Sequence, residues 1–288
     1  MTAKDALLRQ ATDALQKAGL EDPRREARLL LGWATDRDPA GLFSLTTVSE
    51  DDAIRFKQAV MRRAAREPLA FIVGETGFWT LDFHTTPDTL IPRGDSEALI
   101  EALLAVRPDH AAPLRMLDLG TGTGCLLLSA LSEYPQAWGV GVDLSAGAAA
   151  LAHRNAIRNG LQGRSYFLAG NWDSALAGTF DVVISNPPYI ESADVPDLMP
   201  EVSHYEPARA LDGGQDGLDA YRLLCQALPS RLVPGGHAIL EMGLGQIDAV
   251  SVIGRANGLR EVARQNDLGG IARALVLQWP ENSGKTLA

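Results

Sequence analysis

Cysteine and aromatic residues are scarce in this 288-residue chain, and long apolar runs are absent. The two cysteines, Cys125 and Cys225, lie a hundred positions apart, so we expect reduced thiols and no disulfide framework. The five histidines show no metal-ligand spacing, and we expect no metal site. No apolar run approaches the ~20 residues needed to cross a bilayer, and the N-terminus lacks a signal-peptide core. We therefore expect a cytoplasmic protein with no membrane partner.

The negative charge of the chain is unevenly distributed. The formal net charge is −10, but residues 1–66 carry 12 Lys+Arg and 10 Asp+Glu, so the excess of acidic residues lies in the rest of the chain. A strongly acidic main domain disfavours an extended surface that follows nucleic-acid phosphates. We expect no direct nucleic-acid substrate, although a small basic patch remains compatible with this composition.

The first 66 residues predict a small helical domain. Apolar residues recur at helical spacing from Ala6 to Ala18, and Gly19 fits the end of that helix. Asp22-Pro23 is typical of a helix start, and Ser49 before three acidic residues predicts a capped first turn. We place this domain at residues 1–66.

The next segment, residues 67–92, changes character. β-forming residues cluster around glycines at Phe71–Gly74 and Phe78–Phe83, which predicts a β-hairpin linker. Pro87, Pro92 and Gly94 then predict a connecting segment without regular structure before a helix that we expect to begin near Ser96.

From about residue 115 strand patterns and helix patterns alternate. Expected strands are 115–119, 137–143, 165–169, 180–185, 237–243, 259–265 and 273–279, and expected helices are 124–133, 146–159, 216–231 and 246–257. The alternation predicts an α/β fold, with a seven-stranded, mostly parallel sheet covered by helices on both faces. We place this domain at residues 93–288.

A glycine loop follows the first of these strands. The strand runs through Asp118 into Gly120-Thr121-Gly122-Thr123-Gly124, where glycines permit a tight turn and close approach of a ligand. The next strand ends at Asp143, and an acidic residue about 20 positions after such a loop can accept hydrogen bonds from ribose hydroxyls. The loop alone is compatible with several nucleotide binders. Together with Asp143 it indicates a ligand that contains a nucleoside.

Two features of the loop favour S-adenosylmethionine over a dinucleotide. Dinucleotide loops have their third glycine where this chain has Cys125. Asp118, just before the loop, would repel a diphosphate and favour a cationic group. S-adenosylmethionine carries a sulfonium and an ammonium and no phosphate, so it fits better. A simpler role for Asp118, as a cap of the glycine loop, stays open.

Asn171-Trp172-Asp173 follows the third strand, where an adenine ring would lie in such a fold. Trp172 is placed to pack against the purine, and Asp173 to accept a hydrogen bond from its exocyclic amine. A tryptophan that only packs the interior is the alternative interpretation.

The most informative motif is Asn186-Pro187-Pro188-Tyr189, which follows the strand pattern of residues 180–185. A residue before proline is driven towards an extended backbone, and two prolines supply no N–H groups. The motif therefore predicts a stiff rim of carbonyl acceptors ending in an aromatic ring. Such a rim suits a planar –NH2 group, whose two hydrogens it can accept while the nitrogen lone pair faces an electrophile.

The catalytic half of the chain resembles the class I S-adenosylmethionine-dependent methyltransferases, which have a Rossmann-like fold. From about residue 5 to 279 the chain is similar to the PrmC/HemK family of protein-(glutamine-N5) methyltransferases, which modify class-I peptide chain release factors. The resemblance rests on five segments: Glu67–Gly74, Leu90–Arg93, Asp118–Gly124, Asn186–Ile190 and Asp212–Leu218.

This resemblance implies the site residues and the reaction. The cofactor S-adenosylmethionine would contact Gly120, Thr121, Gly122, Thr123, Gly124, Asp143, Trp172 and Asn186, and S-adenosylhomocysteine would be the product. The substrate amide would be held by Asn186, Pro187, Pro188 and Tyr189, with Asn186, the Pro187 carbonyl and Tyr189 as the catalytic groups. The helical domain would orient a release factor, and we expect a monomer.

Two segments depart from the family pattern. Arg93-Gly94-Asp95-Ser96-Glu97 lacks the usual proline after its arginine, and Asp267-Leu268-Gly269-Gly270-Ile271 lacks the usual final arginine. Gln215, in Gly213-Gly214-Gln215, reproduces by coincidence the tripeptide that is methylated in release factors.

Three other functions fit some of these residues. An N6-adenine methyltransferase of nucleic acid would use the same four residues around an exocyclic amine, but this chain lacks a basic, aromatic insertion for a flipped base. A non-catalytic cofactor-binding protein would not need Asn186-Pro187-Pro188-Tyr189. A nicotinamide dehydrogenase would need a different glycine spacing.

Overall fold

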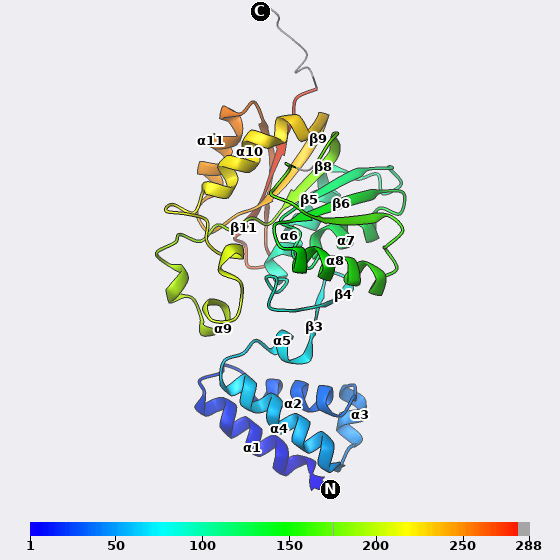
Figure 1. Ribbon diagram of the computed structural model, residues 1–288, viewed down its shortest axis with the longest axis vertical. Coiled ribbons are helices and arrows are strands. Elements are labelled where there is room, and N and C mark those ends of the chain that lie inside the picture. The colour runs from blue at the N-terminus through cyan, green and yellow to red at the C-terminus, as the bar shows by residue number, and fades with distance from the viewer. Residues whose placement is uncertain (175, 282–288) are drawn as a thin grey trace, which may run out of the picture. The chain divides into compact units, whose positions relative to one another are not determined.

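The computed structural model describes residues 1–174 and 176–281, which form two compact units (Figure 1). The first, here called the helical unit, comprises residues 1–75 together with Met199–Tyr205. The second, the sheet unit, comprises Thr76–Leu198 and the chain from Glu206 onward. Within the described parts of the chain, no helix combines the length and apolarity needed to traverse a bilayer.

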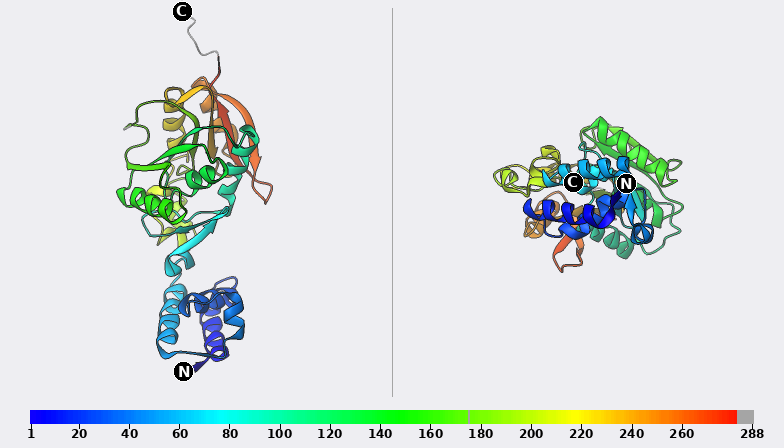
Figure 2. Two further views of the ribbon diagram at one scale, coloured as in Figure 1. Left: turned by 90° about the vertical axis from the view of Figure 1, so that its right-hand side faces the viewer. Right: turned by 90° about the horizontal axis from the view of Figure 1, so that it is seen from below.

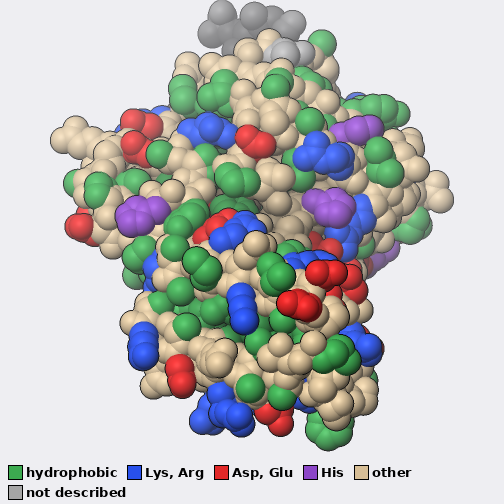
Figure 3. Space-filling view, turned by 60° about the horizontal axis from the view of Figure 1, so that its bottom comes forward, with side chains coloured by type: hydrophobic (Ala, Val, Ile, Leu, Met, Phe, Trp, Pro, Cys, Tyr) green, Lys and Arg blue, Asp and Glu red, His purple; other side chains and the backbone are tan. Residues whose placement is uncertain are grey.

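The helical unit is built from five helices in its first 75 residues and a short sixth from a distant segment. The helices are α1 (Lys4–Lys17), α2 (Pro23–Ala34), α3 (Pro39–Ser44), α4 (Glu50–Ala64), α5 (Leu69–Val73) and α9 (Pro200–Ser203). A two-residue strand, β1 (Thr2–Ala3), pairs with β2 (Thr47–Val48). Basic and acidic side chains are interspersed on the surface of this unit (Figure 3).

Local sequence explains where these helices begin and end. The Asp22 carboxylate accepts a hydrogen bond from the Arg25 N–H (3.2 Å) at the start of α2, and Ser49 Oγ accepts one from the Asp52 N–H (3.1 Å) at the start of α4. These caps satisfy N–H groups that a helix leaves unpaired in its first turn. Gly19 has φ +76° just after α1. The predicted ends of these helices are therefore confirmed.

The predicted β structure at Phe71–Val73 is wrong, because these residues form the last turn of α5. Pro68 precedes the helix and Gly74 ends it with φ +83°, so the segment has a residue typical of a helix start before it and one typical of a helix end after it. Phe71 and Ile72 are buried. The hairpin is shorter than expected and consists of β3 (Glu75–Phe78) and β4 (Leu81–His84).

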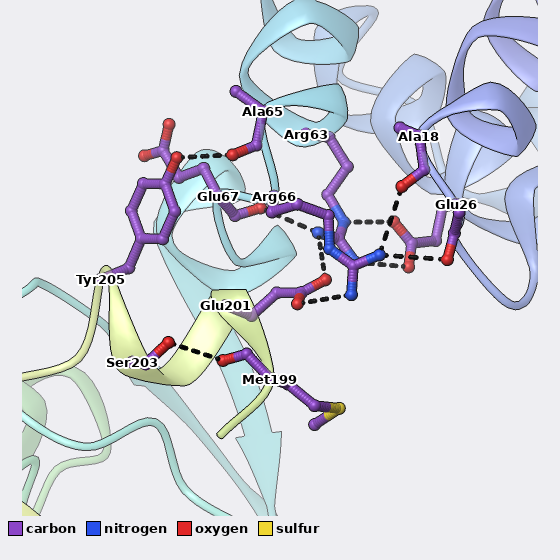
Figure 4. Close-up of polar contacts among 11 residues, drawn as sticks. Ala18, Glu26, Arg63, Ala65, Arg66, Glu67, Met199, Glu201, Ser203 and Tyr205 are labelled. Carbon is purple, nitrogen blue, oxygen red and sulfur yellow. Dashed lines mark hydrogen bonds and ion pairs between the residues drawn. The ribbon is translucent and has the colours of Figure 1, made fainter. Parts of the chain in front are cut away.

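The segment Met199–Tyr205 belongs to the helical unit although it follows Tyr189 by only ten residues in sequence. Glu201 accepts hydrogen bonds from Arg63 Nη1 (2.9 Å) and Arg66 Nη2 (2.7 Å). Tyr205 donates to the Ala65 carbonyl at the end of α4 (2.8 Å). Figure 4 shows both arginines pointing at the Glu201 carboxylate.

A seven-stranded sheet organises the sheet unit. Its strands are β5 (Arg115–Leu119), β6 (Trp138–Asp143), β7 (Ser165–Ala169), β8 (Phe180–Ser185), β9 (Leu232–Glu241), β10 (Arg260–Asn266) and β11 (Ala272–Gln278). Their order is β10-β11-β9-β8-β5-β6-β7. Strand β11 runs antiparallel to both of its neighbours, β9 and β10, and with β10 it forms the orange and red hairpin in Figure 2. The prediction of a mostly parallel, seven-stranded sheet is confirmed.

Helices cover both faces of this sheet (Figure 1). Helices α6 (Glu97–Val106), α7 (Cys125–Glu133) and α8 (Ala146–Arg158) lie on one face, and α10 (Asp219–Arg231) and α11 (Ile247–Ala256) lie on the other. Three short 3-10 helices, η1 (Gly94–Ser96), η2 (Val195–Asp197) and η3 (Ala208–Ala210), lie in connecting segments. Side chains along each central strand point alternately to the two faces: Met116 packs in one apolar core and Leu117 in the other. This arrangement leaves the carboxyl ends of β5, β6 and β8 free to form a ligand site.

Candidate active site

A cavity lies at the carboxyl ends of β5, β6 and β8. Its wall combines the glycine loop, the end of β6, the turn after β7, the start of the Asn-Pro-Pro-Tyr motif and the segment before α6. The lining residues predicted from sequence are Gly120, Thr121, Gly122, Thr123, Asp143, Trp172, Asn186 and Pro188. The structure thus brings eight of the eleven predicted residues to one cavity. Gly124, Pro187 and Tyr189 lie outside its lining.

The glycine loop turns sharply between β5 and α7. Gly120, Gly122 and Gly124 have φ of +78°, +54° and +81°, a region that side chains with a Cβ rarely adopt. A Cβ on Gly124 would meet the Cβ of Ala152 at 3.1 Å, so this glycine also allows the loop to pack on α8. Gly124 therefore lies on the side of the loop that packs against α8, and it does not line the cavity.

Asp118 lies under the loop and is completely buried. One carboxylate oxygen accepts a hydrogen bond from the Thr121 hydroxyl (2.7 Å), and the other, Oδ1, has no hydrogen-bond partner among the described residues. Burial raises the pKa of Asp118 to about 7, with a further increase from Asp143, although the Thr121 hydrogen bond opposes the shift. Asp118 therefore caps the loop with one oxygen and retains an unused acceptor.

Asp143, at the end of β6, connects two turns of the backbone. Its Oδ2 accepts from the Gly122 N–H and its Oδ1 from the Ser145 N–H, both at 2.9 Å. Each oxygen keeps a free lone pair, so the carboxylate can hold the glycine loop and still accept a hydroxyl donor from the cavity.

Trp172 lines the cavity, and Asp173 does not. Trp172 has φ +50°, a strained value for a large side chain. Asp173 instead forms an ion pair with Arg231 Nε of α10 (2.8 Å). The expected acceptance of an adenine amine by Asp173 therefore lacks geometric support, because its carboxylate anchors the turn.

The segment before α6 supplies a cavity wall that no sequence pattern marks as functional. Asp88 to Arg93 line it, and Glu206, only 6% exposed, fixes its position. Glu206 accepts from the Ile91 N–H (3.0 Å) and forms an ion pair with Arg93. Burial raises the pKa of Glu206, and Arg93 opposes that shift. No local pattern could have revealed this contact, which joins residues more than a hundred positions apart.

Asn186 follows β8 directly, at the edge of the cavity. Its side-chain Nδ2 donates to Ser96 Oγ (3.3 Å), and no residue that the structure describes donates to its carbonyl Oδ1. Its backbone carbonyl lies 3.9 Å from the position that a Cβ on Gly120 would occupy. The motif and the glycine loop therefore meet at this point.

The backbone after Asn186 lies in a cradle formed by the Asp212–Leu218 segment. A Cβ on Gly213 would lie 2.7 Å from Tyr189 Cα and 2.9 Å from the Pro188 carbonyl. Gln246 Nε2 donates to the Tyr189 carbonyl (2.9 Å). Glycine is required at Gly213 because another backbone passes where a side chain would be, and this gives a structural reason for that motif.

The two departures from the family pattern lie near each other in the fold. Gly94 begins η1, and a Cβ there would meet nothing within 4 Å. Arg273, two residues after the Asp267–Ile271 turn, forms ion pairs with Asp267 (2.9 Å) and Asp95 (3.0 Å). A guanidinium is thus present beside this turn, supplied by β11.

No group of three or more His, Cys, Asp or Glu side chains in the described ranges is arranged to hold a metal ion. Cys125 lines the cavity, and burial raises its thiol pKa to about 12. A thiol with so high a pKa is a poor nucleophile.

Two family models match the chain. The PrmC N-terminal domain matches residues 6–74, and the methyltransferase small domain matches residues 95–204.

Curated relatives match along most of the chain. The release factor glutamine methyltransferase of Rhodospirillum rubrum is 43% identical over 94% of this chain and 83% of its own length. The enzyme of the same name from Cereibacter sphaeroides is 42% identical over 97% of this chain and 99% of its own length. Among solved structures, a methyltransferase from Pyrococcus furiosus has a TM-score of 0.53 and 19% identity, covering 70% of this chain and 90% of that chain. This last likeness shows the fold.

Proposed function

The chain belongs to the release factor glutamine methyltransferase family, and we propose that it methylates the side-chain nitrogen (N5) of the glutamine in the Gly-Gly-Gln motif of class-I peptide chain release factors. The methyl donor in this proposal is S-adenosylmethionine. The observation that carries it is the meeting of the glycine loop with Asn186, whose carbonyl Oδ1 is left free at the edge of the cavity.

The residues of the cavity fit S-adenosylmethionine. Asp118 has a buried oxygen close to the loop to which none of the described residues donates, and this suits the cationic end of the molecule. Asp143 retains acceptor capacity for ribose hydroxyls, and Trp172 offers a face to the adenine. The two arginines in the wall are already engaged, Arg93 by Glu206 and Arg209 by the Asp88 carbonyl, as expected for a ligand without phosphate.

When bound, this cofactor supplies an electrophilic methyl group on a sulfonium. The chain would hold the glutamine amide by its two hydrogens, one on Asn186 Oδ1 and one on the Pro187 carbonyl, with Tyr189 packed beside the amide. An amide nitrogen is a weak nucleophile because its lone pair is delocalised into the carbonyl group. Both acceptors bind more strongly as the nitrogen becomes positive, so they stabilise the transition state more than the ground state. On transfer the amide nitrogen would gain the methyl group, with S-adenosylhomocysteine as the other product, and would then lose its proton to water.

The helical unit would orient the release factor. The match of the PrmC N-terminal domain to residues 6–74 supports this assignment.

The proposal is tested by offering labelled S-adenosylmethionine with purified release factor and, in parallel, with adenine-containing DNA and RNA. We expect label on the release factor. Label on nucleic acid alone would overturn the substrate and favour an N6-adenine methyltransferase. No label on any acceptor, with cofactor bound, would favour a non-catalytic binding protein.

A further inference from the structure

A buried carboxylate lies directly beneath the Asn-Pro-Pro-Tyr motif. Glu241 is the last residue of β9 and is only 2% exposed. Strands β8 and β9 are parallel with Ser185 opposite Leu240, so Glu241 occupies the position opposite Asn186. A carboxylate at this depth is costly unless it has a function or a partner.

The partners of Glu241 lead to Asn186 and Tyr189. The Tyr189 hydroxyl donates to Glu241 Oε1 (3.3 Å), and the Ser96 side chain lies near enough to this carboxylate to lower its pKa by hydrogen bonding. Ser96 Oγ in turn accepts from Asn186 Nδ2 (3.3 Å). The second carboxylate oxygen, Oε2, has no hydrogen-bond partner among the described residues.

This chain of hydrogen bonds has one direction. An ionised carboxylate only accepts, so the Ser96 hydroxyl must donate its single hydrogen to Glu241. The Ser96 oxygen is then available only as an acceptor, and Asn186 must turn its NH2 group towards it. The Asn186 carbonyl oxygen is consequently left for the substrate. A neutral amide at position 241 would remove this constraint, because an amide both donates and accepts.

We propose that Glu241, acting through Ser96, is a positioning residue that fixes the orientation of the Asn186 amide, so that the site presents an acceptor to the glutamine –NH2 and rejects a glutamate carboxylate. This inference rests on the proposed function, because it assumes that Asn186 binds the substrate amide. Glu241 itself lies outside the lining of the cavity.

The surroundings of Glu241 determine when it is ionised. Burial raises its pKa to about 7, and hydrogen bonds from Ser96 and Tyr189 and the charge of Arg273 oppose the shift. The titratable groups around it are Arg273 from β11, Asp95 from η1, Tyr189 from the motif, Tyr221 from α10 and Cys125 from α7. Glu241 is therefore ionised, and only an acceptor, above pH 7, and the orientation of Asn186 loses its constraint as the pH falls below 7.

The test compares binding of two forms of a purified release factor, one with the motif glutamine and one with glutamate in its place. Binding is measured in the presence of S-adenosylhomocysteine, so that no turnover occurs, for the full-length wild-type enzyme and for Glu241→Gln. We expect the wild type to prefer the glutamine form, and Glu241→Gln to reduce that preference at least about tenfold, because a site built for one hydrogen-bonding pattern rejects the other strongly. Glu281→Gln, at an exposed position, is the matched control and should keep the wild-type preference.

Ser96→Ala is a second variant, included in case Glu241→Gln disturbs folding. It removes the link to Asn186 while leaving Glu241 in place. It should reduce the preference to a similar extent. If both variants weaken binding of the two forms equally, or if the wild type binds both equally, the inference is overturned. Methyl transfer by the wild-type enzyme is measured separately, and its absence would count against the proposed function instead.

Discussion

Arg63 Nη1 lies 2.9 Å from Glu201 Oε1, an ion pair that joins α4 to a segment 138 residues later in the chain. Both side chains are largely buried, and Arg63 also binds Glu26 of α2 while Arg66 binds the second oxygen of Glu201 (Figure 4). The Met199–Tyr205 segment is thereby held as part of the helical unit.

Glu201→Gln should lower the free energy of unfolding of the helical unit by about 2 kcal/mol, because the buried Arg63 and the partly exposed Arg66 each lose an anionic partner, and only Arg63 keeps another among the described residues, Glu26. Chemical denaturation measures this change. Glu21→Gln, at an exposed position of the same unit, is the control and should change stability by less than about 0.5 kcal/mol.

The Glu201 pair also predicts a pH dependence. Burial raises the pKa of Glu201, but the hydrogen bonds from Arg66 and Arg63 lower it by more than burial raises it. The folded-state pKa therefore lies below the ordinary value of 4.5. The stabilisation is therefore complete above the unfolded pKa and is lost as pH falls through the folded pKa. The stability difference between wild type and Glu201→Gln should shrink between pH 5 and strong acid; a difference that grows on acidification would contradict this account.

Asn186→Ala should reduce methyl transfer at least about 100-fold while leaving cofactor binding within a few-fold, since an acceptor used in the transition state is lost. Steady-state kinetics and calorimetric titration with S-adenosylhomocysteine separate the two effects. Asn257→Ala, at the end of α11, is the control. Normal transfer by Asn186→Ala would remove Asn186 from the proposed mechanism.

Gly213→Ala should impair transfer at least about tenfold and cost roughly 1–3 kcal/mol of stability, because the new Cβ would displace the Pro188–Tyr189 backbone. Gly163→Ala is the matched control, as a Cβ there meets nothing within 4 Å and its φ is not positive. If the two alanine variants behave alike, the cradle does not position the motif.

In the absence of any ligand, Asp118→Asn should change the way in which the free energy of unfolding depends on pH. Burial raises the pKa of Asp118 to about 7 from 3.8, so between these values the unfolded chain releases a proton that the folded protein keeps. The contribution of Asp118 to wild-type stability therefore falls as pH rises from about 4 to 7, and the variant lacks this contribution. Thermal unfolding should show Asp118→Asn gaining stability relative to wild type towards pH 8, whereas Asp109→Asn, at an exposed site, should not.

The raised pKa of Asp118 also predicts how the affinity for S-adenosylmethionine varies with pH. Affinity for S-adenosylmethionine should rise with pH through the neutral range in the wild type, because the ionised Asp118 attracts its cationic groups. Titration calorimetry at pH 6 and pH 8 measures the difference. A pH-independent affinity in the wild type would show that Asp118 only caps the loop.

The fold could be predicted because its signals are local. Helix caps at Asp22 and Ser49, the glycine loop and the alternation of strands and helices each depend on residues close in sequence. The error at Phe71–Val73 arose from apolar β-forming residues, whose preference was overridden by Pro68, Gly74 and burial in the helical unit.

Contacts between distant segments could not be predicted from the sequence. Ser96, Glu206 and Glu241 support the cavity through partners that no periodicity or spacing reveals. Asp173 shows the reverse case: its position suggested a ligand contact, but Arg231, 58 residues away, takes its carboxylate.

The most direct test of the account maps the methylated atom. Release factor is incubated with the enzyme and S-adenosylmethionine, and the modified peptide is sequenced by mass spectrometry alongside a release factor whose motif glutamine is replaced. We predict one added methyl group on the side-chain nitrogen of that glutamine, and none on the replaced form. A methyl group on another residue, or undiminished methylation of the replaced form, would contradict the account.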